Sequence, residues 1–143
     1  MKVLIVDDNE AERFIINRIL TKLGVPQSDI IQSHNGEEGL NSINNKDPYV
    51  VLLDINMPKL SGLELLEMVR REKTNPPPFI IMLTTSQRDE DLKLAIEKGA
   101  DAFSIKPNEP SKMKDVLRAI KIKFIDKQSL ELELKDIFQY IKD

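Results

Sequence analysis

The run Val50-Val51-Leu52-Leu53-Asp54 consists of four apolar residues followed directly by a carboxylate. A short run that is apolar at every position predicts a strand buried on both faces, as in a parallel sheet. Apolar runs that end at a polar residue also occupy positions 3–7 and 79–84, a further candidate strand at 102–105 contains Ser104 and ends at Lys106, and a weaker one lies near residues 30–31. We therefore expect five short strands.

Between these strands, apolar residues recur with helical spacing. The clearest case covers residues 16–23, where they follow the i, i+3, i+4, i+7 pattern. Further helices are expected over residues 36–44, 61–69, 91–98 and 110–124. Strand and helix thus alternate five times, which predicts a parallel sheet covered by helices on both faces and joined by right-handed crossovers.

Residues with special backbone preferences mark the ends of several helices. Ser61 and Glu64 stand three residues apart at the start of one helix and predict a capping box. Gly24 and Gly99 lie where glycine commonly terminates a helix, and Pro110 suits a first helical turn.

Composition limits the classes of protein that this chain can be. Its 143 residues fit one domain, expected at residues 1–125, with a short extension at 126–143. The net charge of -3 argues against a nucleic-acid-binding surface. The absence of cysteine excludes disulfides and thiolate metal sites. The apolar stretch 1–6 is too short for a signal peptide or a membrane span, so we expect a cytoplasmic protein without membrane contact.

The extension carries a second amphipathic pattern, and its net negative charge makes it a poor DNA-binding arm. Its apolar residues are Leu130, Leu134, Ile137, Phe138 and Ile141. A helix packed on its own domain and a helix used for dimerisation or partner docking both fit this pattern.

Polar residues follow four of the expected strands. Asp7 and Asp8 follow the first, Asp54 the third, Thr84 the fourth and Lys106 the fifth. In an open parallel sheet these positions share the carboxyl edge, where ligands bind. Clustered carboxylates repel one another, and an oxygen-only donor set favours a hard cation, Mg²⁺ or Mn²⁺. A carboxylate beside such a cation, a hydroxyl and an ammonium can form an acyl phosphate.

These motifs resemble the receiver domain of two-component response regulators, of the single-domain, chemotaxis-regulator-like type. The resemblance extends from Met1 to about Phe124 and rests on Val6-Asp7-Asp8-Asn9, Leu53-Asp54-Ile55-Asn56-Met57-Pro58, Gly62, Leu83-Thr84-Thr85-Ser86 and Lys106-Pro107. It implies a flavodoxin-like, doubly wound (βα)5 fold, with a parallel sheet ordered 2-1-3-4-5.

The resemblance also implies a role for each matching acidic residue. Asp54 corresponds to the phosphoacceptor, Asp8 to a direct metal ligand, and Asp7 to a ligand that acts mostly through water. The backbone carbonyl of Asn56 corresponds to the third protein ligand of a Mg²⁺ ion. The side chains of Asn56 and Ser86 are expected to tune how fast water removes the phosphoryl group.

Further residues match the part of the family's site that responds to phosphorylation. Thr84 is expected to turn its hydroxyl toward the phosphoryl group, which the amide of Thr85 would also face. Lys106 would pair with a phosphoryl oxygen, and Phe103 occupies the aromatic switch position. The family implies a cis peptide bond before Pro107.

The implied function is a phosphorylation-activated switch that signals to a downstream protein. No GxxxxGK[ST] loop is present, so direct use of ATP is not expected. The donor should be a sensor histidine kinase or a phosphotransfer protein, because His34, the only histidine, is expected to have a surface role. Beyond its own phosphorylation and slow dephosphorylation, the chain is not expected to be an enzyme.

Two other functions fit parts of the pattern. A haloacid-dehalogenase-like phosphatase also uses an aspartate nucleophile, Mg²⁺, Thr and Lys. It normally has a second aspartate two residues after the nucleophile, where this chain has Asn56. The other alternative is an interaction module that takes no phosphoryl group. The kinase, the stimulus, the target, the lifetime of the phosphoprotein and the oligomeric state are not specified by the sequence.

Overall fold

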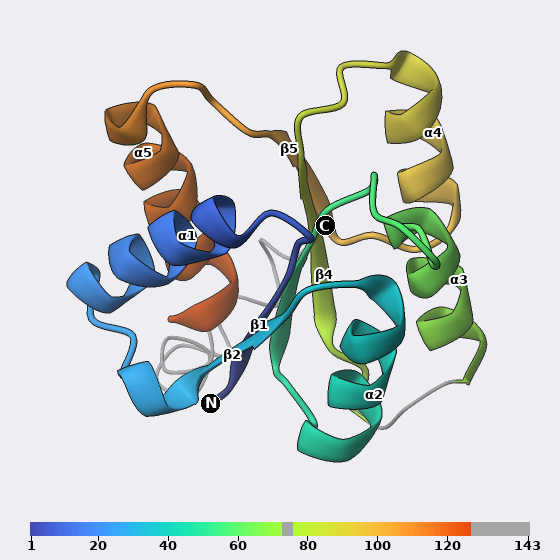
Figure 1. Cartoon of the computed structure of the whole chain (residues 1–143), viewed down its shortest axis with the longest axis horizontal. Coiled ribbons are helices and arrows are strands. Elements are labelled where there is room, and N and C mark those ends of the chain that lie inside the picture. Colours follow the sequence, from blue (N-terminus) through green and yellow to red (C-terminus); the bar gives the residue numbers. More distant parts are fainter. Residues whose placement is uncertain (73–75, 127–143) are drawn as a thin grey trace, which may run out of the picture.

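The computed structural model describes residues 1–72 and 76–126 (Figure 1). One parallel sheet has the strand order β2-β1-β3-β4-β5. Its strands are β1 (Val3–Val6), β2 (Ile30–Ser33), β3 (Val50–Leu53), β4 (Phe79–Thr84) and β5 (Ala102–Ile105). The helices are α1 (Glu10–Lys22), α2 (Gly36–Lys46), α3 (Gly62–Glu72), α4 (Asp89–Glu97) and α5 (Pro110–Ile120). Short helical turns at Gln27–Asp29 and Lys121–Ile125 complete the described part. The predicted doubly wound fold and strand order are confirmed.

The helices cover both faces of the sheet (Figure 1). Helices α1 and α5 lie on one face, and α2, α3 and α4 lie on the other. Strand β1 serves both cores, because Val3 and Ile5 point into one apolar cluster while Leu4 and Val6 point into the other. Burial of each such side chain contributes about 1.5–3 kcal/mol, which accounts for the continuous apolar sequence of the buried strands β1 and β3, whereas the edge strands β2 and β5 are only partly buried.

The predicted helix punctuation is confirmed at each end for which it was expected. The Ser61 hydroxyl accepts from the Glu64 amide at 3.2 Å, and the Glu64 carboxylate accepts from the Ser61 amide at 3.4 Å. Gly24 and Gly99 have φ of 105° and 101°, a region that side chains disfavour. Pro110 occupies the first turn of α5.

Several helices extend beyond their predicted limits: α1 already begins at Glu10, before residue 16, and α3 continues to Glu72, past residue 69. Helix α2 continues to Lys46, two residues past the expected end, and stops where Asp47 adopts a left-handed conformation with φ of 51°. Helix α4 begins at Asp89, before its predicted start at residue 91. The polar residues of its first turn complement the helix dipole, but they add nothing to the apolar pattern from which the start was predicted.

The predictions for the extension fall on residues 127–143, which lie outside the described residues. The division of the chain at residue 125 therefore remains a prediction. Among the helices of the described part, none is both long and apolar enough to cross a membrane.

The register of the sheet aligns the carboxyl ends of its central strands. Val6 lies opposite Leu53, and the Asp54 amide donates to the Val6 carbonyl at 3.0 Å. Thr84 lies opposite Ile105, and the Lys106 amide donates to the Thr84 carbonyl at 2.7 Å. The residues that follow these strands are thus placed side by side by backbone pairing alone.

Gly62 holds the chain after β3 close to the acidic edge, and its substitution tests this packing. Its amide donates to the Ile55 carbonyl at 2.8 Å, and a Cβ at this position would overlap the Asp54 carbonyl, whose carbon would lie 2.8 Å away. Because backbone must move, we expect Gly62→Ala to lower the free energy of unfolding by about 3 kcal/mol, at the upper end of overpacking costs. Urea unfolding measures this loss.

Gly24→Ala is the matched control. Nothing lies within 4 Å of a Cβ at Gly24, so only its positive φ opposes the substitution. We expect a loss of about 1 kcal/mol there. Equal losses in the two variants would contradict the tight approach of Gly62 to Asp54.

Candidate functional site

Three carboxylates meet at the carboxyl edge of the sheet. Asp7 and Asp8 follow β1, Asp54 follows β3, and one carboxylate oxygen from each lies within 4.8 Å of the other two. Asp7 and Asp54 are buried, whereas Asp8 is exposed. Among the described residues, this is the one group of acidic or histidine side chains arranged to hold a metal ion. The predicted meeting of the three aspartates is confirmed.

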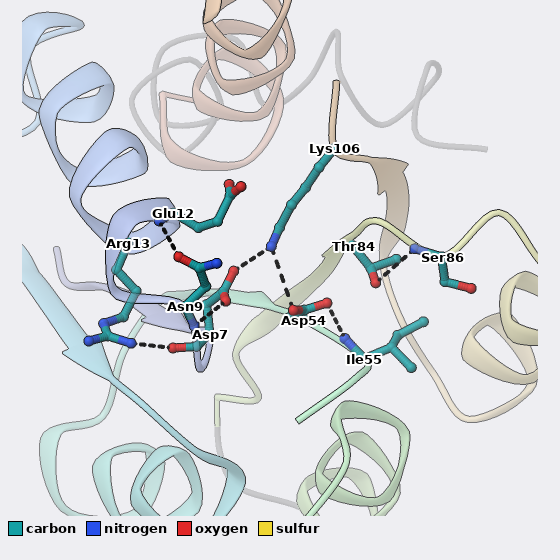
Figure 2. Close-up of polar contacts among 9 residues, drawn as sticks. All are labelled: Asp7, Asn9, Glu12, Arg13, Asp54, Ile55, Thr84, Ser86 and Lys106. Carbon is teal, nitrogen blue, oxygen red and sulfur yellow. Dashed lines mark hydrogen bonds and ion pairs between the residues drawn. The ribbon is translucent and has the colours of Figure 1, made fainter. Parts of the chain in front are cut away.

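The start of α1 fixes the loop that carries the acidic pair. The Asp7 carboxylate accepts from the Asn9 amide at 2.9 Å, and the Asn9 side chain in turn accepts from the Glu12 amide at 3.1 Å. Arg13 reaches back from α1 and donates to the Asp7 carbonyl at 2.6 Å (Figure 2). The helix therefore begins immediately after the acidic pair and leaves the loop little freedom.

Lys106 brings the positive charge that the acidic cluster needs. Its buried ammonium lies 2.5 Å from Asp7 Oδ2 and 3.5 Å from Asp54 Oδ2 (Figure 2). Burial alone would lower the Lys106 pKa, but the hydrogen bond to Asp7 and the charges of Asp54, Asp7 and Glu12 outweigh it and raise the pKa above its ordinary value. Lys106 is therefore held in its charged form.

Burial disfavours the charged form of Asp54. Desolvation raises its pKa above the ordinary value of 3.8, and the neighbouring charge of Asp7 adds to this effect. Lys106, a hydrogen bond from Thr84 and the Ile55 amide, which donates to Asp54 Oδ1 at 2.8 Å, all lower the pKa without cancelling the rise. Any further positive charge placed beside Asp54 would therefore stabilise its charged form.

The residues expected to take part in phosphorylation, or to respond to it, differ in how deeply they are buried. Thr84 is fully buried beside Asp54, while Thr85 and the Asn56 side chain are exposed. Phe103 is partly buried and packs against the apolar cluster on the α2, α3 and α4 face. The roles assigned to these residues, and the cis bond before Pro107, stay predictions.

Ser86 lies beside Thr84, but its hydroxyl turns away from Asp54 (Figure 2). It donates to Asp91 Oδ2 at 2.5 Å, and Asp91 is itself buried in the first turn of α4. No sequence pattern predicts this contact, since an acidic residue in the first turn of a helix ordinarily complements the helix dipole in water. Sequence patterns do not predict the contact of Arg13 either, because its partner is a backbone carbonyl.

Known proteins resemble this chain over most of its length. Residues 3–118 match the family described as the response regulator receiver domain. A chemotaxis protein CheY homologue of Campylobacter jejuni is 36% identical over 121 residues, which are 84% of this chain and 92% of the homologue.

Solved structures show the same fold. A CheY-like receiver domain protein from Methanospirillum hungatei has a TM-score of 0.75 at 31% identity, covering 90% of this chain and 96% of that one. The phosphorylated cyanobacterial phytochrome response regulator RcpA has a TM-score of 0.80 at 23% identity, covering 88% and 94%. At that identity, the likeness to RcpA shows the fold alone.

Replacement of Lys106 tests its part in stabilising the cluster. Lys106→Met leaves the buried Asp7 carboxylate without its ammonium partner, and loss of one member of a buried ion pair costs about 3–5 kcal/mol. We expect a loss of this size in urea unfolding with a chelator, and partial recovery when Mg²⁺ is added. Lys98→Met, which removes a more exposed ion pair with Glu67, should cost much less. Similar losses in both variants, or no recovery with Mg²⁺, would contradict the proposed electrostatics.

The raised pKa of Asp54 predicts a pH-dependent gain in stability from Asp54→Asn. A carboxyl group whose pKa is higher in the folded state than in the unfolded state opposes folding at neutral pH, and this opposition fades as pH falls through the folded pKa. Without metal, we expect Asp54→Asn to be more stable than the parent chain at neutral pH. The difference should shrink under mild acid. A difference in unfolding free energy between the two chains that does not vary with pH would contradict the raised pKa of Asp54.

Proposed function

Because the chain belongs to the response regulator receiver domain family, whose members are phosphorylation-activated signalling domains, we propose that Asp54 accepts the phosphoryl group. One observation carries this proposal: Asp54 lies at the carboxyl edge of the sheet with Asp7, Asp8 and Lys106 all gathered around its carboxylate. Among the described carboxylates, only Asp7 shares all of these neighbours, and it is already engaged by Lys106 at the shorter distance of 2.5 Å.

The donor set fits a hard divalent cation. Three carboxylate oxygens within 4.8 Å of one another, without histidine or cysteine, suit Mg²⁺, with Mn²⁺ as the alternative. We propose that Asp8 and Asp54 bind the ion directly, that Asp7 acts mostly through water, and that the Asn56 carbonyl completes the protein ligands. When bound, the ion would neutralise charge on the transferring phosphoryl group.

The proposed reaction makes one bond and breaks one. A carboxylate oxygen of Asp54 bonds to the phosphorus of a phosphohistidine, and the phosphorus–nitrogen bond breaks with its electron pair staying on the donor imidazole. Lys106, already 3.5 Å from Asp54, is placed to pair with a phosphoryl oxygen. The Thr84 hydroxyl and the Thr85 amide would donate to the other oxygens.

Phosphorylation would act on the fold through these new contacts. Charge-assisted hydrogen bonds from Thr84 and Lys106 contribute about 1.5–3 kcal/mol each. A shift from 1:99 to 99:1 between two states requires about 5.5 kcal/mol. The two bonds reach that value only at the upper end, so burial of the partly exposed Phe103, or binding of a partner, would complete the switch. Asn56 and Ser86 would tune the rate at which water removes the phosphoryl group.

The chain would work between two other proteins. We propose a sensor histidine kinase or phosphotransfer protein as donor and a downstream protein as target, with a cytoplasmic location and no contact with nucleic acid or membrane. Dimerisation through the extension at residues 126–143 stays a prediction. The family match disfavours the haloacid-dehalogenase-like phosphatase, and an interaction module that takes no phosphoryl group would leave the acidic cluster without a purpose.

Reaction with a small acyl phosphate tests the proposed acceptor. With Mg²⁺ present, we expect intact-mass measurements to show the gain of one phosphoryl group, which disappears with a chelator. Asp54→Asn should gain none, because an amide is not a nucleophile of this kind. Asp47→Asn, a surface aspartate in the loop after α2, should be phosphorylated like the parent chain. Loss of labelling in both variants, or in neither, would contradict the assignment to Asp54.

A further inference from the structure

Ser86, which is proposed to tune loss of the phosphoryl group, forms a buried polar pair with Asp91, a residue that the phosphoryl chemistry described above does not use. Ser86 lies in the loop between β4 and α4 and is 9% exposed, and Asp91 lies in the first turn of α4 and is 7% exposed. The Ser86 hydroxyl donates to Asp91 Oδ2 at 2.5 Å. Hydrogen bonds of this length to a carboxylate are about twice as strong as those between neutral groups.

The pair is joined to the candidate phosphorylation site by one more hydrogen bond. The Ser86 amide donates to Thr84 Oγ1 at 3.3 Å, and Thr84 lies directly beside Asp54 (Figure 2). The Arg88 amide also donates to the Ser86 hydroxyl oxygen, at 3.4 Å. Ser86 is thus bound through both its backbone and its side chain, and its hydroxyl is directed toward α4.

We propose that Asp91 is a positioning residue for phosphoryl chemistry at Asp54. By holding the Ser86 hydroxyl, it fixes the loop after Thr84 and keeps that hydroxyl away from the phosphoryl group. This inference rests on the proposed function, because it concerns the lifetime of the phosphorylated form. Asp91 acts through Ser86 and does not itself touch the reacting atoms.

The step that Asp91 would influence is hydrolysis of the aspartyl phosphate. Water oxygen bonds to phosphorus, the bond from phosphorus to the Asp54 oxygen breaks, and the products are the Asp54 carboxylate and dihydrogen phosphate, which keeps both water protons. A Ser86 hydroxyl released from Asp91 can turn toward the site and orient this water. The observed arrangement therefore favours a longer-lived phosphoprotein.

A helix-capping role would give a different result. Asp91 is one of three acidic residues in the first turn of α4, where negative charge stabilises a helix. Asp89→Ala removes such a charge from an exposed position without touching Ser86, so it is the matched control. If Asp91 only stabilised the helix, both alanine variants would lose stability and neither would change the rate of hydrolysis.

The test follows loss of the phosphoryl group from the full chain after labelling with a small acyl phosphate and Mg²⁺. We expect Asp91→Ala to hydrolyse roughly three to ten times faster than the parent chain, the range that one intramolecular hydrogen bond produces. The acceleration should vanish in the double variant Asp91→Ala with Ser86→Ala. Asp89→Ala should match the parent, and Asp91→Asn, which keeps an acceptor for Ser86, should restore most of the parent's rate.

The outcomes separate this inference from the proposed function. A parent chain that gains no phosphoryl group would overturn both. If the parent chain is labelled, two results would overturn only the role of Asp91. Asp91→Ala could hydrolyse at the parent's rate, or the double variant Asp91→Ala with Ser86→Ala could hydrolyse as fast as Asp91→Ala alone. If Asp91→Ala does not fold, Asp91→Ser replaces it in the same comparison, because serine is well accepted near a helix N-terminus.

Discussion

The structure depends on charge balance at one edge of the sheet. Parallel pairing of β1 with β3 places Asp7 beside Asp54, whatever their side chains prefer. Two buried carboxylates and a third at the surface repel one another, and Lys106 is the buried cation beside them in the described residues. Burial is the main cause of the raised pKa of Asp54, and the charge of Lys106 does not fully offset it. Such a site favours the binding of a divalent cation, because the cation offsets the negative charge. A phosphoryl group bound next would draw Lys106 toward itself.

Backbone contacts transmit this local chemistry outward. The Ile55 amide donates to Asp54, while Thr84 connects the same carboxylate to the loop that leads into α4. The pair formed by Ser86 and Asp91 ties that loop to the helix. A change in charge at Asp54 can therefore reach α4 through a short path of contacting groups, without a rearrangement of the sheet.

Sequence patterns predicted the fold well because its central strands are buried on both faces. The bounds of β1 and β3 follow directly from apolar runs that end at polar residues. Residues at the carboxyl ends of parallel strands share one edge of the sheet, which also predicted that Asp7, Asp54 and Lys106 lie together. Helix ends were less accessible, since the start of α4 at Asp89 and the left-handed residue that ends α2 add nothing to apolar periodicity. Partner choice was least accessible: the preference of Lys106 for Asp7, and that of Ser86 for Asp91, depends on side-chain geometry that spacing does not encode.

The location of a bound cation tests the central claim most directly. Anomalous scattering from crystals grown with Mn²⁺ would place the ion without reference to any assumed ligand. We expect one strong peak among Asp7, Asp8 and Asp54, within bonding distance of the Asp8 and Asp54 carboxylates and the Asn56 carbonyl. A peak bound elsewhere with this cluster empty, or no bound ion at saturating Mn²⁺, would contradict it.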